Sequence, residues 1–284
     1  MANKTFMRYF PILLLSCSLT VAACSNSLDD FLEEMSESDS SSMFYTDTLT
    51  IAHWNIGHFA LGKSGSTTIS AEDSEPMASL YKALIDSIDA DVFGVCEYNP
   101  TFSVAGEKTS SYIFGDYPYN CIGSKLSYNC NAIFSRAKLN DSMVVFFEKR
   151  VQHRYYVVSK LFINDHEVFF IETHLDWNQG TEGKECRAAQ IQSLIDEFRN
   201  YPYVIICADY NVSDINEFQP FVDDGFSLAN GGELGEIYTY PSSKPKHAID
   251  NIVIKGFKIL SFDVGDNAKL SDHCVVVSQL YFLN

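Results

Sequence analysis

The sequence predicts an α/β fold in which two β-sheets pack face to face and helices cover their outer sides. Short apolar segments rich in β-branched and aromatic residues recur from about Thr48 to the C-terminus, with few, well-separated helical patterns among them. No Pro/Gly-rich linker and no internal repeat divides this region. With 284 residues and 46% hydrophobic content, the chain can bury a full core as one large domain or two small ones. We therefore assign residues 48–284 to one domain.

The first half of this domain is expected to consist mainly of strands. A strand over 49–54 ends at Asn55, and a short buried strand over 91–96 ends at Glu97. The segment 76–88 between them has apolar residues at helical spacing. The residues expected on the buried face of that helix are Met77, Leu80, Leu84, Ile85 and Ile88. Further strands are predicted over 129–135, 142–148, 154–163 and 167–173, the later ones as a meander.

The second half begins with another helix and ends in strands. The helix is predicted over 182–198, and its core-facing stripe is Ile191, Leu194, Ile195 and Phe198. A strand that is apolar on both faces follows over 203–207. The remaining expected elements are a short helix near 215–221 and strands over 248–254, 257–264 and 273–282.

The N-terminus has the pattern of an export signal. Lys4 and Arg8 precede the apolar run YFPILLLSCSLTV, which ends in small residues before Cys24. This run is shorter than the roughly 20 apolar residues that span a bilayer. The string VAAC resembles a bacterial lipobox, so we predict a lipoprotein signal peptide over 1–23 and a lipid on Cys24. Plain cleavage near Ala23 followed by secretion is the alternative.

Residues 24–47 are rich in Ser, Asp and Glu and have few apolar residues to bury. We expect this segment to be a disordered tether between the lipid and the domain. Acidic residues soon after Cys24 resemble the surface-export signals of some Gram-negative lipoproteins. The sequence therefore predicts a lipid-anchored protein on the periplasmic or cell-surface face of a bacterial membrane.

The net charge of −17 limits the possible partners. An acidic surface repels phosphate backbones, which argues against broad nucleic-acid affinity but not against a nuclease that brings a divalent metal. Among eight cysteines, no CxxC motif or Cys/His cluster indicates zinc. Cys121 and Cys130 flank an expected hairpin, and an exported protein could pair them.

Polar residues recur where the predicted strands begin or end. A single such residue could be a turn residue, but their recurrence indicates that one rim of the sandwich collects them. Carboxylate and carbonyl oxygens suit Mg²⁺, and an imidazole can transfer a proton. The residues in question are Asn55, Glu97, His174, Asp209, Asn211, Asp250, Asp272 and His273.

At these residues the chain resembles the endonuclease/exonuclease/phosphatase superfamily, the DNase I-like group. The resemblance covers roughly Thr48 to Asn284 and consists of ordered motifs. The matching strings, in order, are AHWNIG, VCEYN, CNAIFSR, ETHLDW, ADYN, IDNIVI and LSDHCVV. The departures from the usual motifs are Tyr98, Ala208, Tyr210 and Asn251, none of which removes a carboxylate, the catalytic amide or either motif histidine.

This resemblance implies a four-layer α/β sandwich with two mixed or antiparallel sheets, which hydrolyses phosphate esters with Mg²⁺ or Mn²⁺. Glu97 would be the main metal ligand, with Asn55 and Asp272 nearby. Asp209 would orient or deprotonate the attacking water, and Asn211 would donate to the phosphate or fix that Asp.

The resemblance also assigns roles to the remaining motif residues. His273 would contact the phosphate or act as a base, and Asp250 would hold its other ring nitrogen. His174, in its charged form, would hydrogen-bond a phosphoryl oxygen. Arg187 is either a substrate contact or a structural link from its helix to a loop. The other histidines, His53, His58, His153, His166 and His247, are expected in loops or at the surface.

The function predicted on these grounds is a phosphodiesterase or phosphatase that acts outside the cytoplasm. Its substrate would be a phospholipid head group, a nucleotide, nucleic acid or a sugar phosphate. An extracellular nuclease is the first alternative. A non-catalytic surface lipoprotein that binds a ligand in the same cleft is the second. We expect a monomer, attached to the membrane through Cys24.

Overall fold

The computed structural model describes residues 44–60, 71–104, 107–123, 130–150, 153–212, 214–230, 237–267 and 269–283. The predicted signal peptide, Cys24 and the tether up to residue 43 lie outside these ranges. Phe44 packs with the domain, because its N–H donates to the carbonyl of Phe162 and its carbonyl accepts from the N–H of Asn164, both at 3.0 Å. Within the described ranges, no helix is long and apolar enough to cross a bilayer.

Two six-stranded sheets form the centre of the domain, and both are mixed. In the first sheet the strand order is β13-β14-β1-β2-β6-β5, and only β1 and β2 run parallel. In the second it is β11-β12-β10-β9-β8-β7, and only β9 and β10 run parallel. The first sheet comprises β1 (Leu49–Asn55), β2 (Val92–Tyr98), β5 (Tyr119–Ile122), β6 (Cys130–Ser135), β13 (Phe257–Val264) and β14 (Val276–Phe282). The second comprises β7 (Asn140–Phe146), β8 (Tyr155–Ile163), β9 (His166–His174), β10 (Val204–Asp209), β11 (Ser227–Leu228) and β12 (Asp250–Lys255).

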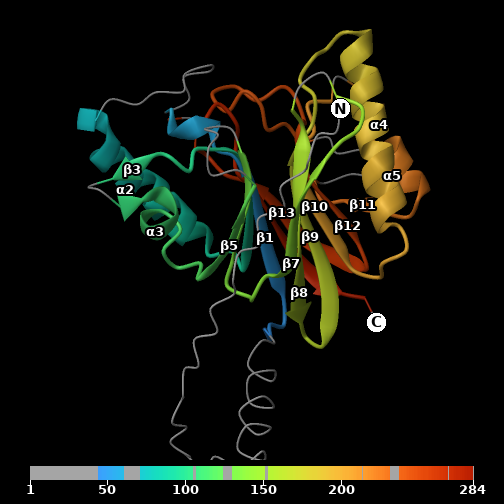
Figure 1. Cartoon of the computed structure of the whole chain (residues 1–284), viewed down its shortest axis with the longest axis horizontal. Helices are drawn as coiled ribbons and strands as arrows, with labels where there is room; N and C mark the ends of the chain where they lie inside the picture. The colour runs from blue at the N-terminus through green and yellow to red at the C-terminus, as the bar shows by residue number, and fades with distance from the viewer. Residues whose placement is uncertain are drawn as a thin grey trace, which may run out of the picture. The chain divides into compact units, whose positions relative to one another are not determined.

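Helices cover the outer face of each sheet, which gives the four layers expected from the sequence (Figure 1). The helix α2 (Ala71–Ile88) and the short α3 (Thr109–Tyr112) lie on one side, and α4 (Thr181–Phe198) and α5 (Gln219–Asp223) lie on the other. Short 3-10 turns, η1 (Gly57–Phe59) and η2 (Ile215–Phe218), and a two-stranded ribbon of β3 (Ser103–Val104) and β4 (Glu107–Lys108) complete the described elements. The predicted fold class is therefore confirmed.

The two-residue period of the strands divides the core into layers. On β10, Ile205 and Cys207 belong to the core between the sheets, whereas Val204 and Ile206 pack in the cluster under α4. Asp209 continues the inward row two residues after Cys207. The same alternation on β9 directs Phe170 between the sheets, so Glu172 and His174 also lie on the inward row. A polar residue at the end of a row of inward-facing strand residues therefore lies at the edge of the space between the sheets.

Some local predictions need correction. Leu80 is 56% exposed, and α2 instead buries Ala78 and Tyr81, because Tyr81 packs against the ring of Trp54 at 5.6 Å. The hairpin of β5 and β6 is present, but Cys121 lies opposite Ile133 and not opposite Cys130, so the two do not form a disulfide; Cys130 Sγ instead donates to the carbonyl of Tyr98 at 3.1 Å. The final strand begins only at Val276, which leaves the SDH motif in the preceding loop.

Candidate active site

Parallel strands bring the predicted polar residues to one end of the sandwich. On the parallel pair β1 and β2, Asn55 lies beside Cys96, directly before Glu97. On the parallel pair β9 and β10, His174 lies beside Asp209. The strand β12 runs antiparallel to β10, so its first residue, Asp250, is the partner of Asp209. The carboxyl ends of four strands and the start of a fifth therefore meet at the same edge.

Asp209 is at the centre of this group. Its Oδ2 accepts a hydrogen bond from Asn55 Nδ2 at 3.0 Å and lies 3.4 Å from His174 Nε2 and 3.7 Å from His273 Nε2. Its Oδ1 accepts from the backbone N–H of Asn211 at 3.0 Å. The carboxyl group is 1% exposed, and burial raises its pKa to about 6 although His273 opposes the shift. Asp209 is thus a buried acceptor surrounded by donors.

His273 forms a dyad with Asp250. Its Nδ1 lies 2.9 Å from Asp250 Oδ2, so its Nε2 faces Asp209. The hydroxyl of Thr239 donates to the same Asp250 oxygen at 2.6 Å. Burial alone would lower the pKa of His273, but Asp250 and Asp209 outweigh it and raise the pKa to about 10. The imidazole is therefore held as a cation between two carboxylates.

Glu97 lies beside His174, with its Oε1 4.0 Å from His174 Nδ1, and next to a histidine that sequence reasoning missed. Its φ is +51°, at an irregularity in the pairing of β2 with β6, and this turns its carboxylate away from the ladder. His58 Nε2 lies 3.0 Å from Glu97 Oε2, and His58 is only 8% exposed. His58 lies in the short turn η1 after β1, as a loop position predicted, but it is buried and not at the surface. Burial would raise the pKa of Glu97, but His58 and His174 lower it well below its usual range.

Glu97 and Asp272 fit a divalent cation. Both line the same cleft, and among the described residues neither forms an ion pair with Lys or Arg. Burial and the nearby Glu97 carboxylate raise the pKa of Asp272, although His273 opposes this. Gly57, at φ +58°, adopts a backbone conformation that favours glycine, and it lies beside this pair, since a Cβ there would lie 3.2 Å from Ser271 Oγ and 3.5 Å from Asp272 Oδ1. Two partly buried carboxylates that repel each other are a suitable donor set for a hard cation.

His174 and Asn211 complete the predicted set. Burial and the nearby Arg154 lower the pKa of His174 well below its usual value, which favours the neutral ring before a substrate binds. The charged form predicted from the sequence for the transition state stays a prediction. Its Nδ1 has no hydrogen-bond partner in the described part of the chain. Asn211, at φ +52°, donates from Nδ2 to the carbonyl of Leu175 at 3.2 Å. The side chain of Asn211 is thus held by the backbone beside the cleft.

A cleft of about 560 Å³ unites these groups. Asn55 and Asp250, each at most 1% exposed, lie behind its wall. The residues that line it are Glu97, Arg154, His174, Trp177, Gln179, Asp209, Asn211, Val212, Tyr240, His247, Ile249, Asp272 and His273. The cleft therefore has a polar half with the predicted residues and a more apolar part with Trp177, Val212, Tyr240 and Ile249.

Arg154 is a second residue that sequence reasoning missed. It is 7% exposed, lines the cleft and, within the described ranges, forms no ion pair. Its Nε has no hydrogen-bond partner, and burial lowers its pKa. The carboxylates of Asp209, Asp176 and Glu97 oppose this shift from a distance. A buried guanidinium with no direct ion pair is costly unless an anion binds there. The only sequence signal is its position directly before the apolar strand β8, which resembles an ordinary strand boundary.

Arg187 does not belong to the cleft. It is fully buried in α4, where its Nε donates to Glu217 Oε2 at 2.8 Å. Its Nη1 donates to the carbonyls of Asp176 and Asn178 at 3.0 and 2.7 Å. Of the two roles predicted for Arg187, the structure therefore supports the structural link, which joins α4 to two loops, and not the substrate contact.

Fold and cleft together define a hydrolase-like α/β sandwich with a carboxylate–imidazole site at one end of two stacked sheets. The chain belongs to the endonuclease/exonuclease/phosphatase family, whose family model matches residues 52–273. No curated protein sequence matches the chain.

Solved structures share the fold at low sequence identity. A humanized TDP2 from D. rerio has a TM-score of 0.65 and 15% identity, with 83% of this chain and 99% of that chain covered. An endonuclease/exonuclease/phosphatase from Bacteroides vulgatus has a TM-score of 0.63 and 16% identity, covering 84% and 100%. One from Beutenbergia cavernae has a TM-score of 0.64 and 16% identity, covering 84% and 72%. These likenesses concern the DNase I-like fold.

Proposed function

We propose that this protein is a hydrolase of phosphate esters that depends on Mg²⁺ or Mn²⁺. The observation that carries the proposal is the arrangement around Asp209, whose Oδ2 lies 3.0–3.7 Å from Asn55, His174 and His273 in one cleft with Glu97 and Arg154. A buried carboxylate beside imidazoles and a free guanidinium suits the attack of water on a phosphate ester.

Glu97 and Asp272 would hold the cation, with Asn55 nearby. When bound, a divalent cation polarises a phosphoryl oxygen and stabilises the leaving oxygen. Asn55 contributes in another way as well, since its Nδ2 donates to Asp209 and its Oδ1 accepts from the N–H of Gly57 at 3.1 Å. Asn55 thereby fixes the proposed base next to the metal ligands.

Asp209 is the proposed acceptor of the proton from water. With its pKa raised to about 6, Asp209 is ionised at neutral pH and is more basic than an exposed Asp. The hydrogen bonds from Asn55 and from the N–H of Asn211 fix both carboxylate oxygens. Because the Asp209 carboxylate cannot rotate freely, a water molecule must bind directly against it to transfer a proton.

Arg154, His174 and His273 are the proposed phosphate contacts. Arg154 would supply a positive charge that forms no ion pair among the described residues, although Asp209, Asp176 and Glu97 lie near enough to oppose the lowering of its pKa. The neutral His174 would donate one N–H, and the cationic His273, held by Asp250, would stabilise charge that develops in the transition state. Asn211, held beside the cleft, completes the polar wall.

The substrate is expected to carry an organic group next to the phosphate. Trp177, 57% exposed, lines the cleft with Tyr240 and Ile249, and these side chains suit a ring or an alkyl group. The net charge of −17 disfavours long polyanions. A nuclease remains the second candidate, because a structural neighbour, TDP2 from D. rerio, is described as complexed with single-strand DNA product.

A substrate panel tests the proposal. Purified protein with Mg²⁺ or Mn²⁺ is assayed on a phospholipid, a nucleotide diester, a sugar phosphate and supercoiled plasmid. Hydrolysis of a small ester that EDTA abolishes and added metal restores is the expected result. Plasmid cleavage alone would support the nuclease. Absence of metal-dependent hydrolysis, together with no Mn²⁺ binding by calorimetry, would contradict the proposal and favour the non-catalytic alternative.

The protein is further proposed to be a lipoprotein anchored through Cys24 on the periplasmic or cell-surface side of a bacterial membrane, and to act as a monomer. The support is the sequence pattern of residues 1–24. Metabolic labelling with a fatty acid should mark the wild type but not a Cys24→Ala variant. Equal labelling of both would contradict the assignment.

A further inference from the structure

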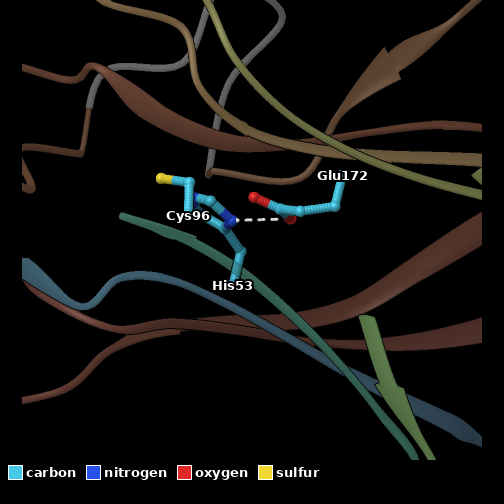
Figure 2. Close-up of side chains that lie close together, drawn as sticks. All are labelled: His53, Cys96 and Glu172. Atoms are coloured by element: carbon cyan, nitrogen blue, oxygen red, sulfur yellow. Dashed lines mark hydrogen bonds and ion pairs between the residues drawn. The ribbon is translucent and has the colours of Figure 1, made fainter. Parts of the chain in front are cut away.

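A second carboxylate–imidazole pair lies between the sheets, directly behind the cleft. His53 on β1 and Glu172 on β9 are both fully buried, and His53 Nδ1 lies 3.1 Å from Glu172 Oε2 (Figure 2). Each is two residues before a proposed site residue on the same strand, Asn55 and His174, so each faces the same inter-sheet space. The expected loop or surface position of His53 is therefore wrong.

The space for this pair depends on a glycine. A Cβ at Gly94 would lie 2.1 Å from Glu172 Oε2 and 3.1 Å from Cys207 Cβ. The carboxylate thus occupies volume that a side chain at position 94 would otherwise fill. Burying a carboxylate in a core costs free energy that an apolar residue would not. The His53–Glu172 pair costs folding free energy, and it lies two residues before Asn55 and His174 on the same strands. We therefore look for a role beyond packing.

His53 connects Glu172 with the proposed catalytic dyad. Its Nε2 faces Asp250 Oδ1 at 3.6 Å and has no other partner among the described residues. The other oxygen of Asp250 lies 2.9 Å from His273 Nδ1. The groups therefore alternate from the core to the cleft, in the order Glu172, His53, Asp250, His273 and Asp209.

We propose that His53 and Glu172 are positioning residues that orient Asp250 toward His273. His273 Nδ1 lies 2.9 Å from Oδ2 and 3.1 Å from Oδ1 of Asp250, and Thr239 donates to Oδ2. The imidazole of His53 approaches Oδ1 from the other side, with its Nε2 at 3.6 Å. Glu172 holds Nδ1 of that imidazole, which fixes the ring so that Nε2 faces Asp250. The inference rests on the proposed function, since it assigns the pair to the same reaction.

Two substitutions at the pair test this role. In Glu172→Gln the side chain keeps its size beside Gly94 but loses its charge, and in His53→Gln the ring is removed. We expect kcat to fall about tenfold in each, as for other residues that orient a catalytic ligand, while KM changes less than twofold. In an Asp250→Asn background the same changes should have no further effect on kcat, because the pair acts through Asp250.

A control separates positioning from stability. Ser278 is buried in β14, away from the cleft, and its hydroxyl donates to the carbonyl of Ser261 at 2.9 Å. Ser278→Ala should lower the Tm without a change in kcat. Wild-type kcat in both Glu172→Gln and His53→Gln, with only a lowered Tm, would overturn the proposal, and so would full additivity with Asp250→Asn.

A measurement without substrate keeps the two proposals distinguishable. The imidazole Nδ1 proton of His273, followed by NMR, should have a downfield resonance that shifts in Glu172→Gln and is unchanged in Ser278→Ala. A shift without hydrolysis of any substrate would support the positioning and contradict the proposed function. An unchanged resonance would overturn the positioning.

Cys96 Sγ also lies within 4.8 Å of the ligand atoms of the pair (Figure 2). Stoichiometric zinc that is lost in Cys96→Ser would therefore also overturn it, in favour of a buried metal site.

Discussion

The two ends of the inter-sheet space are built from the same strands but from different side chains. Toward the end of the sandwich away from the cleft, the inward rows carry Val168 and Phe170 on β9 and Ile205 on β10, all buried and apolar. At the cleft end, the same rows continue as Glu172, His174 and Asp209.

This change along a single strand separates stability from function. Burial of an apolar side chain contributes roughly 1.5–3 kcal/mol to folding, whereas a buried carboxylate contributes only if it is paired. The cleft end meets this requirement with imidazoles that lie within 3.7 Å of Asp209, Asp250 and Glu172. The apolar end is therefore expected to determine stability and the cleft end to determine activity.

The largest effect is expected for Asp209→Asn. The substitution keeps the shape but removes the proposed proton acceptor, so hydrolysis should fall by about 10²–10⁴-fold. The Tm should stay the same or rise, because a buried charge is removed. Steady-state kinetics measures the rate of hydrolysis, and thermal unfolding measures the Tm. The control is Asp196→Asn, a substitution of the same kind at an exposed residue. Activity within threefold of the wild type would contradict the assignment.

The opposite behaviour is expected for Ile205→Ala on the same strand. A large-to-small change in the core should destabilise the domain by about 2–5 kcal/mol. Urea unfolding measures this change. The kcat of the folded fraction should equal that of the wild type, because Ile205 is separated from Asp209 by Cys207 on the inward face of β10. A matching loss of kcat would mean that the two ends are not separable.

Two arginines sharpen the comparison between binding and structure. Arg154→Met should raise KM about 10–100-fold, because a charge-assisted contact to phosphate is worth about 1.5–3 kcal/mol. Arg187→Met should leave KM unchanged and lower the Tm, because its partners are Glu217 and backbone carbonyls. The reverse pattern, with KM affected only in Arg187→Met, would show that the cleft has been assigned to the wrong arginine.

The smallest effect is expected at Leu80 on the outer helix. This residue is 56% exposed, so Leu80→Ser should change the free energy of unfolding by no more than about 0.5 kcal/mol. Its neighbour Tyr81 is fully buried against Trp54, and Tyr81→Ala should cost about 3–5 kcal/mol. Chemical denaturation of the two variants side by side gives the comparison. Similar losses in both would contradict the described face of α2.

Much of the site could be predicted because strand geometry is local. Asn55, Glu97, His174 and Asp209 each follow an apolar strand, and the ends of parallel strands meet at one edge. The motif order also predicted the two mixed sheets. These features depend on period and polarity, which a sequence displays directly.

The missed residues depend on contacts between distant segments. Arg154 starts a strand, as many surface residues do, and only its burial without a counter-ion distinguishes it. His53 lies on the same strand face as Ile51 and Asn55, a signal that was present, but its partner Glu172 is 119 positions away. Leu80 was expected in the core because helical periodicity does not reveal which side of a wide apolar stripe meets the sheet.

The most direct test of the site is a crystal structure with Mn²⁺ and inorganic phosphate. The account predicts anomalous density for manganese in contact with Glu97 and Asp272, and phosphate within hydrogen-bond distance of Arg154 and His174. Manganese bound elsewhere, or phosphate outside the cleft with Arg154 unchanged, would contradict it.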